Sequence, residues 1–493
     1  MKTLLIAPPS NASNPVLPLG LAFLAASLRK NGWAVQVLDI WAEQLTADEV
    51  VQRVKALAPD VVGVSIMSPN LVLAMRTIVQ IRKVSNAVIV VGGAHPSALP
   101  EQCLRDFPAI DFVVQGEGDE SFVALLERIR DRSTDFSGIP GIYYRLQGTI
   151  HSTGGSGFVK DLNVLEFPAR DLFPLSLYTT HPPYGKNKAY MNMITSRGCP
   201  YQCTYCSSSV SGRKYRGISP QRMVEEVELI ISRYGVREIH FYDDDFTMNR
   251  KRVEQFCDLI VAKGISIAWS CTTRVDLVTP ELLRKMRESG CWLISYGVES
   301  ANSDILKRIK KGYGLAEVEQ AFLWTKQAKI RTVAYLIVGL PGETPETIRE
   351  TAEFSLRLDP DFVSWGIHTL FPGSPMFAEA VRERPKLIAA YHDAASNSIA
   401  QDLGSPYVAG QYAIYDNDFT HEQLAVFVKE ANRLFYLRFS YMIRILFKIR
   451  SFYEFKYYLM AGFTTIRWLT TSRDRLSVLD SDISPSLGNS TGT

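Results

Sequence analysis

The chain is organised around one short stretch, Arg197-Gly198-Cys199-Pro200-Tyr201-Gln202-Cys203-Thr204-Tyr205-Cys206. Its three cysteines follow a C-x3-C-x2-C spacing on a turn-prone loop that comes directly after the apolar segment 190–195. Three thiolates this close together can converge on one metal centre, and three ligands leave one coordination position open. A structural zinc site is normally closed by four ligands, and no fourth cysteine or histidine lies nearby in sequence. An iron-sulfur cluster with one iron free for a substrate fits better. The plain alternative is that these are ordinary cysteines.

The loop resembles the cluster loop of radical S-adenosylmethionine (SAM) enzymes in its spacing, in the aromatic Tyr205 before the last cysteine and in its place after a strand. The resemblance implies that Cys199, Cys203 and Cys206 bind a 4Fe-4S cluster whose open iron chelates the amino and carboxylate groups of SAM, with Tyr205 beside the SAM. An electron from the cluster would then release a 5'-deoxyadenosyl radical. An external one-electron reductant of the flavodoxin or ferredoxin class would supply that electron.

Length and composition narrow the class of protein. The 493 residues suffice for two or three domains, and 46% hydrophobic with 21% charged residues is ordinary for a globular protein. A net charge of +3 is too small to argue for nucleic acid as a partner. Seven cysteines in so long a chain do not make a disulfide scaffold, and the N-terminus lacks the apolar core of a signal peptide. We therefore expect a cytoplasmic protein.

Residues 1–150 alternate short apolar segments with amphipathic ones. Strands are expected at 4–7, 35–40, 61–67, 88–91 and 112–114, and helices at 19–31, 47–57, 71–84 and 121–130. This alternation predicts a doubly wound, Rossmann-like parallel sheet with helices on both faces. Ligands of such folds bind at the carboxyl ends of the strands, which directs attention to the loops 8–20, 65–70 and 92–96.

These loops resemble the cobalamin-binding domain that precedes many radical SAM modules. Ser65 stands where that family has a Ser-x-Leu motif near the nucleotide tail of cobalamin. Gly92 and Gly93 stand where it has a glycine pair that lets the backbone approach the cofactor. The alternative is a generic doubly wound domain whose glycine pair only ends a strand.

The family's histidine ligand to cobalt has no counterpart in this sequence. When Gly20 is taken as the glycine of the Asp-x-His-x-x-Gly motif, the ligand position falls on Leu17, which cannot bind cobalt. His95 lies in another loop, where it is expected near the cofactor rather than on the metal. The resemblance therefore implies a cobalamin whose own base is displaced and whose cobalt has no histidine ligand from the protein.

A second alternation follows a linker at 151–189. Apolar segments occur at 191–195, 238–242, 266–272, 293–298, 332–338 and 362–370, with helical stretches between them. Six parallel strands with intervening helices fit the partial (β/α)6 barrel of the radical SAM family over 190–380. Active-site residues of such barrels emerge from the carboxyl ends of the strands.

Two acidic segments at these strand ends match the family. The run 242–247 resembles the Asp-rich motif near the SAM amino group, where the carboxylates of Asp244 and Asp245 could accept hydrogen bonds from the ammonium. At least one of the three aspartates, Asp243 to Asp245, is instead expected to sit in a solvated turn that caps the next helix. Glu299, in the Gly-x-Glu-Ser motif after the fourth strand, is expected to bridge the ribose hydroxyls.

Three further matches concern Arg274 and the segments 309–312 and 338–344. By analogy Arg274 meets the SAM carboxylate bidentately, with a surface ion pair as the alternative. Gly339 and Pro341 are expected against the adenine, although the same segment also reads as a strand-to-helix turn with an N-cap at position 344. The Ile-Lys-Lys-Gly run at 309–312 matches the family, and on its own it would be interpreted as a solvated helix end.

The resemblance weakens beyond residue 380. Residues 381–471 are expected to form a helical region, with an amphipathic helix at 420–437 and a basic, aromatic stretch at 438–468. We favour a cap over the barrel for this stretch, and contact with a membrane surface is the alternative. Residues 472–493, rich in Ser, Asp, Gly and Thr, are expected to be disordered.

Taken together, these motifs resemble a cobalamin-dependent radical SAM enzyme. The resemblance implies three cofactors, a 4Fe-4S cluster, SAM and cobalamin, and the methylation of an unactivated carbon by way of a deoxyadenosyl radical and methylcobalamin. One alternative is an oxidative cyclisation or rearrangement of the anaerobic magnesium-protoporphyrin monomethyl ester cyclase type. Another is a corrinoid- or SAM-binding protein without turnover. No motif identifies the small-molecule substrate.

Overall fold

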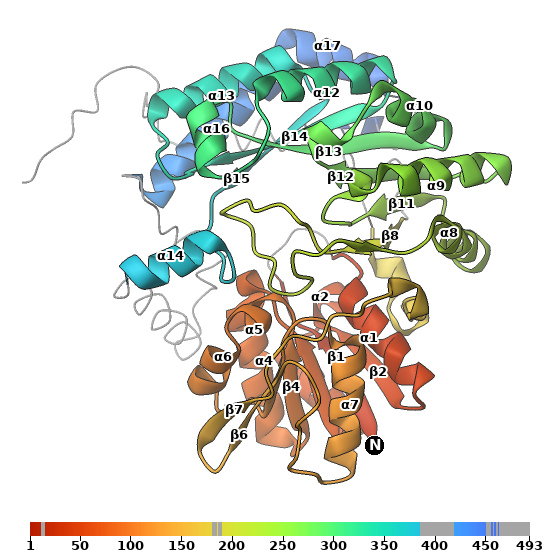
Figure 1. Ribbon diagram of the computed structural model, residues 1–493, viewed down its shortest axis with the longest axis vertical. Coiled ribbons are helices and arrows are strands. Elements are labelled where there is room, and N and C mark those ends of the chain that lie inside the picture. The colour runs from red at the N-terminus through yellow and green to blue at the C-terminus, as the bar shows by residue number, and fades with distance from the viewer. Residues whose placement is uncertain are drawn as a thin grey trace, which may run out of the picture.

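The first domain is a doubly wound sheet, which lies at the bottom of Figure 1. In the computed structural model, residues 1–10, 15–179, 185, 190–384, 419–449, 455–456, 458–459 and 462 are described. The strand order is β2-β1-β3-β4-β5-β6-β7, and the first five strands are parallel. This confirms the predicted Rossmann-like sheet, whose valine- and isoleucine-rich strands are buried between helices on both faces.

The elements of this domain begin and end close to where the hydrophobic pattern predicts. They are β1 (Lys2–Ala7), α1 (Leu19–Lys30), β2 (Ala34–Asp39), α2 (Ile40–Glu43), α3 (Ala47–Leu57), β3 (Val61–Ser65), α4 (Leu71–Val84), β4 (Val88–Gly92), α5 (Ala94–Ala98), α6 (Pro100–Asp106), β5 (Phe112–Val114), α7 (Gly118–Arg130), β6 (Ile142–Leu146) and β7 (Thr149–Ser152). The antiparallel hairpin of β6 and β7 and the short helices α2, α5 and α6 were not predicted.

The second domain is an open parallel sheet of six strands in the order β15-β14-β13-β12-β11-β8, as predicted for a partial barrel. A separate two-stranded ladder, β9 with β10, brackets the cysteine loop. The elements are β8 (Met191–Met193), β9 (Ser196–Arg197), β10 (Arg216–Gly217), α8 (Pro220–Tyr234), β11 (Glu238–Phe241), α9 (Arg250–Ala262), β12 (Ala268–Thr273), α10 (Pro280–Glu288), β13 (Cys291–Glu299), α11 (Ser303–Arg308), α12 (Leu315–Gln327), β14 (Arg331–Val338), α13 (Pro345–Leu358), β15 (Phe362–Ile367) and α14 (Pro375–Glu383).

Local signals decide where these helices start and stop. Helix α8 begins where the Ser219 side chain accepts a hydrogen bond from the Arg222 N–H, with Pro220 at the first helical position. It ends at Gly235, whose φ of 67° is the left-handed conformation that closes many helices. Helix α8 leads into β11, whose carboxyl end lies at the same edge of the barrel as the cysteine loop.

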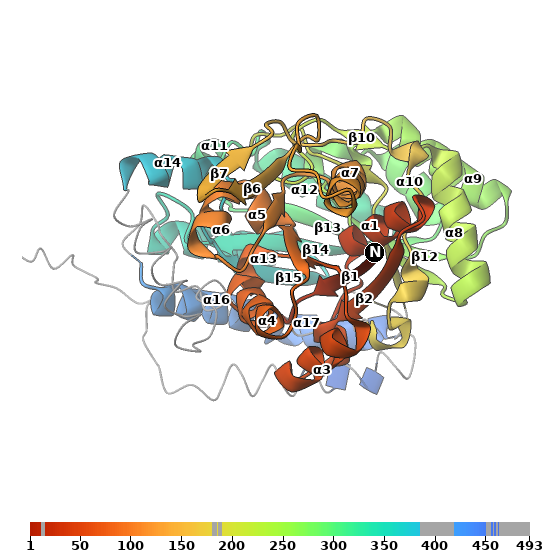
Figure 2. The same ribbon diagram turned by 90° about the horizontal axis from the view of Figure 1, so that it is seen from below.

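The two domains share one hydrophobic core. A single cluster of buried side chains contains Ala22 and Phe122 of the first domain, Met193 and Trp269 of the barrel, and Phe435 near the C-terminus. In the view from below, the first sheet lies across the barrel sheet (Figure 2). The carboxyl ends of both sets of strands therefore face one interdomain space.

Two C-terminal helices, α16 (His421–Tyr436) and α17 (Phe439–Lys448), pack on the barrel. The Tyr436 hydroxyl donates to the Val363 carbonyl at 2.7 Å, and the Tyr441 hydroxyl donates to the Asp361 carbonyl at 3.1 Å. These contacts agree with the predicted helical cap. Residues 385–418 and most of 450–493, including the predicted tail, lie outside the described residues.

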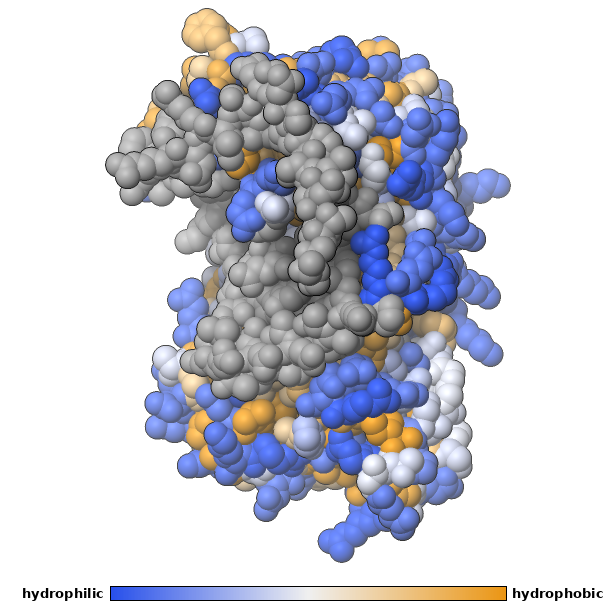
Figure 3. All heavy atoms as spheres, turned by 90° about the vertical axis from the view of Figure 1, so that its left-hand side faces the viewer, coloured by the Kyte–Doolittle hydropathy of each residue, from blue (hydrophilic) through white to orange (hydrophobic). Residues whose placement is uncertain are grey.

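The outer face of α17 is apolar. Phe439 and Phe447 are 75% and 86% exposed. In the side view of Figure 3, hydrophobic side chains project at the upper end of the molecule, the end where α17 lies in Figure 1. Among the described residues, no helix combines the length and the hydropathy needed to cross a bilayer.

Candidate functional site

A cavity of about 230 Å³ lies between the first domain and the cysteine loop. Three predicted cobalamin residues line it, because Ser65 ends β3, Gly92 ends β4 and Gly93 follows it. Arg197 and Asp244 of the second domain line the same cavity. The structure therefore brings the predicted cobalamin loops and the strand ends of the barrel to one site.

Gly93 is required for this arrangement of the strand ends. Its φ is +97°, and a Cβ there would lie 2.7 Å from the carbonyl oxygen of Ile66. The position thus needs both the left-handed backbone and the missing side chain of glycine. The glycine pair has a structural reason of its own, close packing against the end of β3.

The other two predicted cobalamin residues do not line the cavity. His95 is buried, and its Nδ1 lies 3.0 Å from the Ser68 hydroxyl. Leu17 is also buried, and its carbonyl accepts a hydrogen bond of 2.9 Å from the Asn192 side chain of the barrel. Leu17 therefore helps to join the two domains.

The cysteine loop is held at several points along its length. Gly198 has a φ of +85°, and a Cβ there would lie 2.4 Å from the carbonyl oxygen of Lys214, which comes just before β10. The Gly198 N–H donates to Asp244 Oδ2 at 3.2 Å. At the far side, the Thr204 N–H donates to the Ile309 carbonyl at 3.0 Å. The cysteines thus lie on a short, anchored segment.

The three thiols lie near enough to influence one another electrostatically. Burial raises the pKa of the Cys199 thiol, against a backbone hydrogen bond from Tyr201, and the nearby carboxylates and Cys203 raise it further. Desolvation, followed by the neighbouring Cys203 and Cys199, raises the pKa of Cys206 to about 11. Thiols of this kind become thiolates when they bind a cation, since a coordinating metal deprotonates them.

The donor set fits an iron-sulfur cluster better than a single ion. No three of the described His, Cys, Asp and Glu side chains are placed to hold one metal ion together. In a 4Fe-4S cluster each cysteine binds a different iron, so its ligands need not share one centre. The remaining cysteines of the described chain, Cys103, Cys257, Cys271 and Cys291, are buried in the core, where Cys271 lies against Cys291. Buried cysteines of this kind behave as small hydrophobic residues.

Tyr205 and Glu299 meet beside the cysteine loop, together with a residue the sequence interpretation missed. The Tyr205 hydroxyl donates to Glu299 Oε1 at 2.9 Å, and Lys311 Nζ lies 2.7 Å from the same oxygen. Lys311 is 6% exposed, so the interpretation of 309–312 as a solvated helix end is wrong for this residue. Among the described residues, Glu299 Oε2 accepts no hydrogen bond, which leaves it available to a ligand.

An irregular end of β13 explains how Glu299 reaches this position. Glu299 has a φ of +67°, and the register between β13 and β14 shifts between Gly297 and Glu299. A Cβ on Gly297 would lie only 2.4 Å from Glu299 Oε1, so the carboxylate folds back over a glycine. Left-handed backbone at a residue other than glycine is uncommon and concentrates at functional sites.

The three aspartates of the Asp-rich segment have different roles. Asp243 is buried and accepts hydrogen bonds from the backbone and side chains of Thr195 and Ser196. It braces the connection into β9, whereas Asn249 caps the following helix, so the capping interpretation is wrong. Asp244 lines the cavity.

Asp245 has the properties expected of a ligand for a cationic ammonium. Its Oδ1 accepts a hydrogen bond of 2.6 Å from the Thr273 hydroxyl, and its buried Oδ2 has no partner among the described residues. Burial raises the pKa of Asp245 to about 6. A cation at Oδ2 would supply the missing partner.

Arg274 is buried and is not free for a bidentate contact, because it already forms an ion pair with the exposed Asp276. Its guanidinium already makes two bonds of 2.9 Å to Asp276, through Nε and Nη2. The group is sandwiched between the rings of Tyr201, at 3.5 Å, and Tyr313, at 4.8 Å. Its buried Nη1 has no partner in the described part of the chain, so one donor remains for a ligand.

The segment after β14, which is predicted to contact adenine, is closely packed against other parts of the protein. Gly339 has a φ of +83°, and a Cβ there would lie 2.8 Å from Leu424 of α16. The N–H groups of Gly339 and Leu340 donate to Glu343 Oε2 at 2.6 and 2.9 Å, and burial raises the pKa of Glu343 to about 8. The predicted turn is confirmed, because the Thr344 side chain caps α13.

Pro341 lines a second cavity, of about 310 Å³. Thr204 of the cysteine loop and His368 after β15 line it too. Burial lowers the pKa of His368 to about 4, so its imidazole is neutral at pH 7. The cysteine loop therefore borders two hollow spaces.

Comparisons with known proteins identify both halves of this site. Residues 10–126 match the B12 binding domain, and residues 193–355 match the radical SAM superfamily. The "Uncharacterized methyltransferase" of Pyrococcus horikoshii is 30% identical over 462 residues, covering 92% of this chain and 96% of that protein. The chain belongs to the cobalamin-binding radical SAM family.

Other members of the family are similar over shorter spans or in fold alone. The anaerobic magnesium-protoporphyrin IX monomethyl ester cyclase of Cereibacter sphaeroides is 31% identical over 73% of this chain, which spans 60% of that protein. The structure of the radical SAM methyltransferase TsrM from Kitasatospora setae, with cobalamin and a 4Fe-4S cluster bound, matches with a TM-score of 0.66 at 20% identity, covering 78% of this chain and 75% of that chain. OxsB with aqua-cobalamin bound gives 0.67 at 15% identity, covering 95% and 84%.

Family membership assigns the cofactors by domain. Cobalamin belongs to the first domain, and SAM with a 4Fe-4S cluster belongs to the second. The chain is thus a radical SAM enzyme whose two cofactor domains face each other across the cavity that Ser65 and Arg197 line.

Proposed function

We propose that this enzyme methylates an unactivated carbon of a small molecule at the interdomain cavity. The observation that carries this proposal is that one cavity has the predicted cobalamin residues Gly92 and Gly93 on one wall and Arg197 and Asp244, beside the cysteine loop, on the other. When bound, the cluster supplies an electron for the cleavage of SAM, and cobalamin supplies a methyl group. The whole-length similarity to a methyltransferase supports the methylation.

The side chains divide the work of holding these cofactors. We assign Cys199, Cys203 and Cys206 to the cluster. For SAM, the unpartnered Oδ2 of Asp245 suits the ammonium, the Nη1 of Arg274 suits the carboxylate, and the Oε2 of Glu299 suits the ribose hydroxyls. Lys311 and Tyr205 hold the Glu299 carboxylate in place.

The domain limits, the partners and the compartment are also proposals. We propose domain limits of 1–150, 151–189, 190–380 and 381–471. A small-molecule substrate would react in the space between the domains, and a flavodoxin- or ferredoxin-class protein would reduce the cluster. A reducing compartment such as the cytoplasm suits thiolates that hold an iron-sulfur cluster.

Oxidative cyclisation is the second candidate, because the cyclase of Cereibacter sphaeroides has nearly the same percentage identity as the methyltransferase over the 73% of this chain that it matches. SAM carrying a deuterated methyl group separates the two. The reconstituted enzyme is incubated anaerobically with this SAM, hydroxocobalamin and a chemical reductant. We expect 5'-deoxyadenosine and transfer of the deuterated methyl group to the corrinoid.

Two other outcomes of this experiment point away from methylation. Formation of 5'-deoxyadenosine without label on the corrinoid would favour the cyclase-type reaction. Absence of both products from a protein with an intact cluster would indicate a binding protein without turnover.

Gly20 offers a direct test of the cobalamin assignment. It lines the cavity, and a Cβ there would meet no atom within 4 Å. We expect Gly20→Trp to fill the cavity and weaken hydroxocobalamin binding by about tenfold or more, which corresponds to about 1.4 kcal/mol. The matched variant Gly20→Ala lies in α1, where alanine is favoured, and should bind as the wild type does. Equal binding by both variants would place the corrinoid elsewhere.

A further inference from the structure

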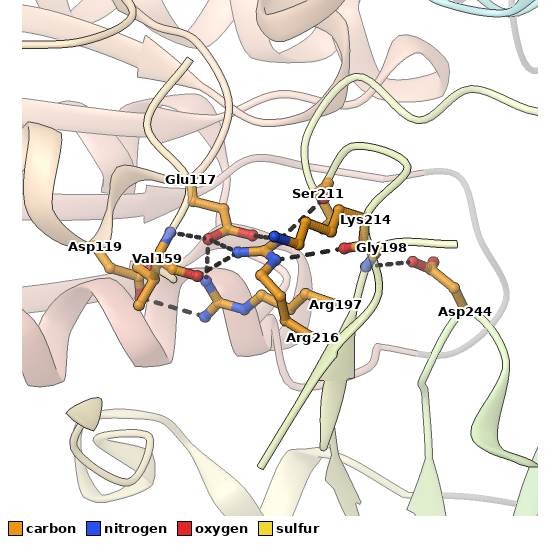
Figure 4. A network of polar contacts seen from close by, with 9 residues as sticks. All are labelled: Glu117, Asp119, Val159, Arg197, Gly198, Ser211, Lys214, Arg216 and Asp244. Atoms are coloured by element: carbon orange, nitrogen blue, oxygen red, sulfur yellow. Dashed lines mark hydrogen bonds and ion pairs between the residues drawn. The ribbon is translucent and has the colours of Figure 1, made fainter. Parts of the chain in front are cut away.

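Four charged side chains join the two domains beside the cavity. Glu117 and Asp119 lie at the start of α7 in the first domain, and both are buried. Arg197 on β9 and Arg216 on β10 stand at the two ends of the cysteine loop, directly opposite each other in the ladder. Figure 4 shows the two guanidinium groups reaching the two carboxylates from the side of the cysteine loop. We call these four residues the interdomain clamp.

The contacts within the interdomain clamp are short and numerous. Arg216 makes two bonds to Glu117, of 2.9 and 2.5 Å. Arg197 makes two to Asp119, of 2.6 and 3.3 Å, and its Nη1 also lies 3.3 Å from Glu117. Arg216 further donates to the carbonyl of Val159 at 2.6 Å. Two arginines face two carboxylates, so each buried charge is paired with an opposite charge.

Arg197 connects this clamp to both cofactor regions. Its guanidinium lies 5.1 Å from the centre of the Phe23 ring, and Arg197, Phe23, Glu117 and Asp119 all line the cavity. Along the backbone, Gly198 follows, donates its N–H to Asp244, and leads directly into Cys199. A change in the position of Cys199 can therefore move the cavity wall through Gly198 and Arg197.

We propose that the interdomain clamp couples cobalamin affinity to the state of the cluster. A bound cluster restrains Cys199, which restrains Arg197 and, through Asp119 and Glu117, the wall of the cavity. This proposal rests on the assignment of the cavity to cobalamin. Coupling of two binding sites is reciprocal, so bound cobalamin would favour cluster binding to the same extent. Arg197, Arg216, Glu117 and Asp119 are positioning residues in this scheme.

Equilibrium dialysis against hydroxocobalamin tests the coupling without any turnover. The dissociation constant is measured for the wild-type protein before and after anaerobic reconstitution of its cluster. We expect the cluster-loaded protein to bind about fivefold more tightly or better, within the range usual for coupled sites. In Asp119→Asn, which keeps the shape of the side chain and loses its charge, the ratio of the two constants should fall towards one.

A second clamp variant and a matched control keep the outcome readable. Arg197→Lys retains the positive charge and loses the bidentate contact with Asp119, so the ratio of the two dissociation constants should fall in this variant too. This variant keeps the test possible if Asp119→Asn does not fold. Asp171→Asn removes the partly exposed pair of Arg29 and Asp171, which joins α1 to the linker with a 2.8 Å contact, and should leave the ratio unchanged. A wild-type ratio of one, or a wild-type ratio retained in both clamp variants, would overturn the coupling.

The control in the cavity separates this failure from failure of the proposed function. Hydroxocobalamin that binds Gly20→Trp as tightly as the wild type would show that the cavity does not hold the corrinoid. Weak binding to Gly20→Trp, together with an unchanged ratio in the clamp variants, would contradict the coupling alone.

Discussion

A single buried lysine, Lys311, compensates the charge of the Glu299 carboxylate. Lys311 and Tyr205 both contact Oε1 of this carboxylate, which sits on a left-handed residue at the end of β13. A buried carboxylate without a counter-ion is costly, because little water is left to solvate it. The lysine therefore permits an acidic residue at a position that SAM is expected to contact.

Substituting this lysine should destabilise the protein. Lys311→Met keeps the apolar stem and leaves Glu299 buried without its cation, and we expect the free energy of unfolding to fall by about 3–5 kcal/mol. Urea unfolding at pH 7 measures the change. The neighbouring Lys310 is exposed, so Lys310→Met should change stability by less than about 0.5 kcal/mol. Equal losses in the two variants would contradict the buried ion pair.

Glu343 predicts a pH dependence of stability. Burial raises its pKa from 4.5 to about 8 in the folded protein, against two backbone hydrogen bonds that lower it. The folded state then holds the proton more tightly than the unfolded state, so the stabilisation is complete below pH 4.5 and is lost as the pH rises through 8. Wild type should lose stability relative to Glu343→Gln across this window. A constant difference between the two unfolding free energies would rule the raised pKa out.

Residue identities could be predicted here better than residue contacts. The strand-end positions of Asp245, Glu299 and Arg274 follow from the alternating hydrophobic pattern. The contacts that these residues make do not follow from the pattern. Lys311 contacts Glu299 only because the register shifts at the end of β13, and Asp276 binds the Arg274 guanidinium because a local turn brings the two together. Neither the register shift nor the local turn can be predicted from the spacing of residues along the chain.

Among the elements, the cysteine loop depends on one glycine. Gly198→Ala would place a Cβ 2.4 Å from the Lys214 carbonyl oxygen at a φ of +85°. We expect this variant to retain the fold and to bind substantially less iron and sulfide per chain after reconstitution. Gly235→Ala is the matched control, since Gly235 also has a positive φ, of +67°, but nothing lies within 4 Å of its Cβ position. Full cluster content in Gly198→Ala would show that the loop tolerates displacement.

Helix α16 acts as a structural part of the barrel. Leu424 is fully buried and packs with Val338, Ile348 and Phe427 over the end of β14. We expect Leu424→Ala to lower the free energy of unfolding by about 2–5 kcal/mol, as for other large-to-small changes in a core. Leu434 on the same helix is 42% exposed, so Leu434→Ala should cost far less. Similar losses from the two changes would argue against a packed cap.

The elements that escaped prediction are short or polar. Strands β6 and β7 meet at Gln147 and Gly148, whose φ values of 49° and 81° suit a two-residue hairpin turn. Both strands carry polar residues, and β7 is the edge strand of the sheet, so the apolar pattern is weak there. The glycine in the turn was the one available signal.

At the scale of the whole molecule, the shared core makes the two domains one thermodynamic unit. Hydroxocobalamin at 100 times its dissociation constant should stabilise the folded state by about 2.7 kcal/mol. We expect calorimetry to show one transition that moves upward as a whole, because Met193 and Trp269 of the barrel share a core with Phe122. At the same concentration, a Gly20→Trp variant that binds tenfold more weakly should gain only about 1.4 kcal/mol. Two transitions, only one of which responds to corrinoid, would mean that the domains unfold independently.

The domain organisation was predictable from the sequence, whereas the interdomain clamp was not. Two alternating patterns in succession predicted a doubly wound domain and a partial barrel. Glu117 and Asp119 read equally well as the acidic start of a helix, and Arg197 as an ordinary neighbour of Cys199. Only the packing of the two domains distinguishes these roles, since the partners lie far apart in the sequence.

The ladder of β9 and β10 has a consequence for cluster assembly. Arg197 and Arg216 pair with each other, so the ends of the cysteine loop are joined before any iron arrives. The loss of chain entropy on closing this loop therefore belongs to folding rather than to metal binding. A free peptide of the same sequence would have to bear that loss during assembly, and should hold its cluster less tightly than the folded chain.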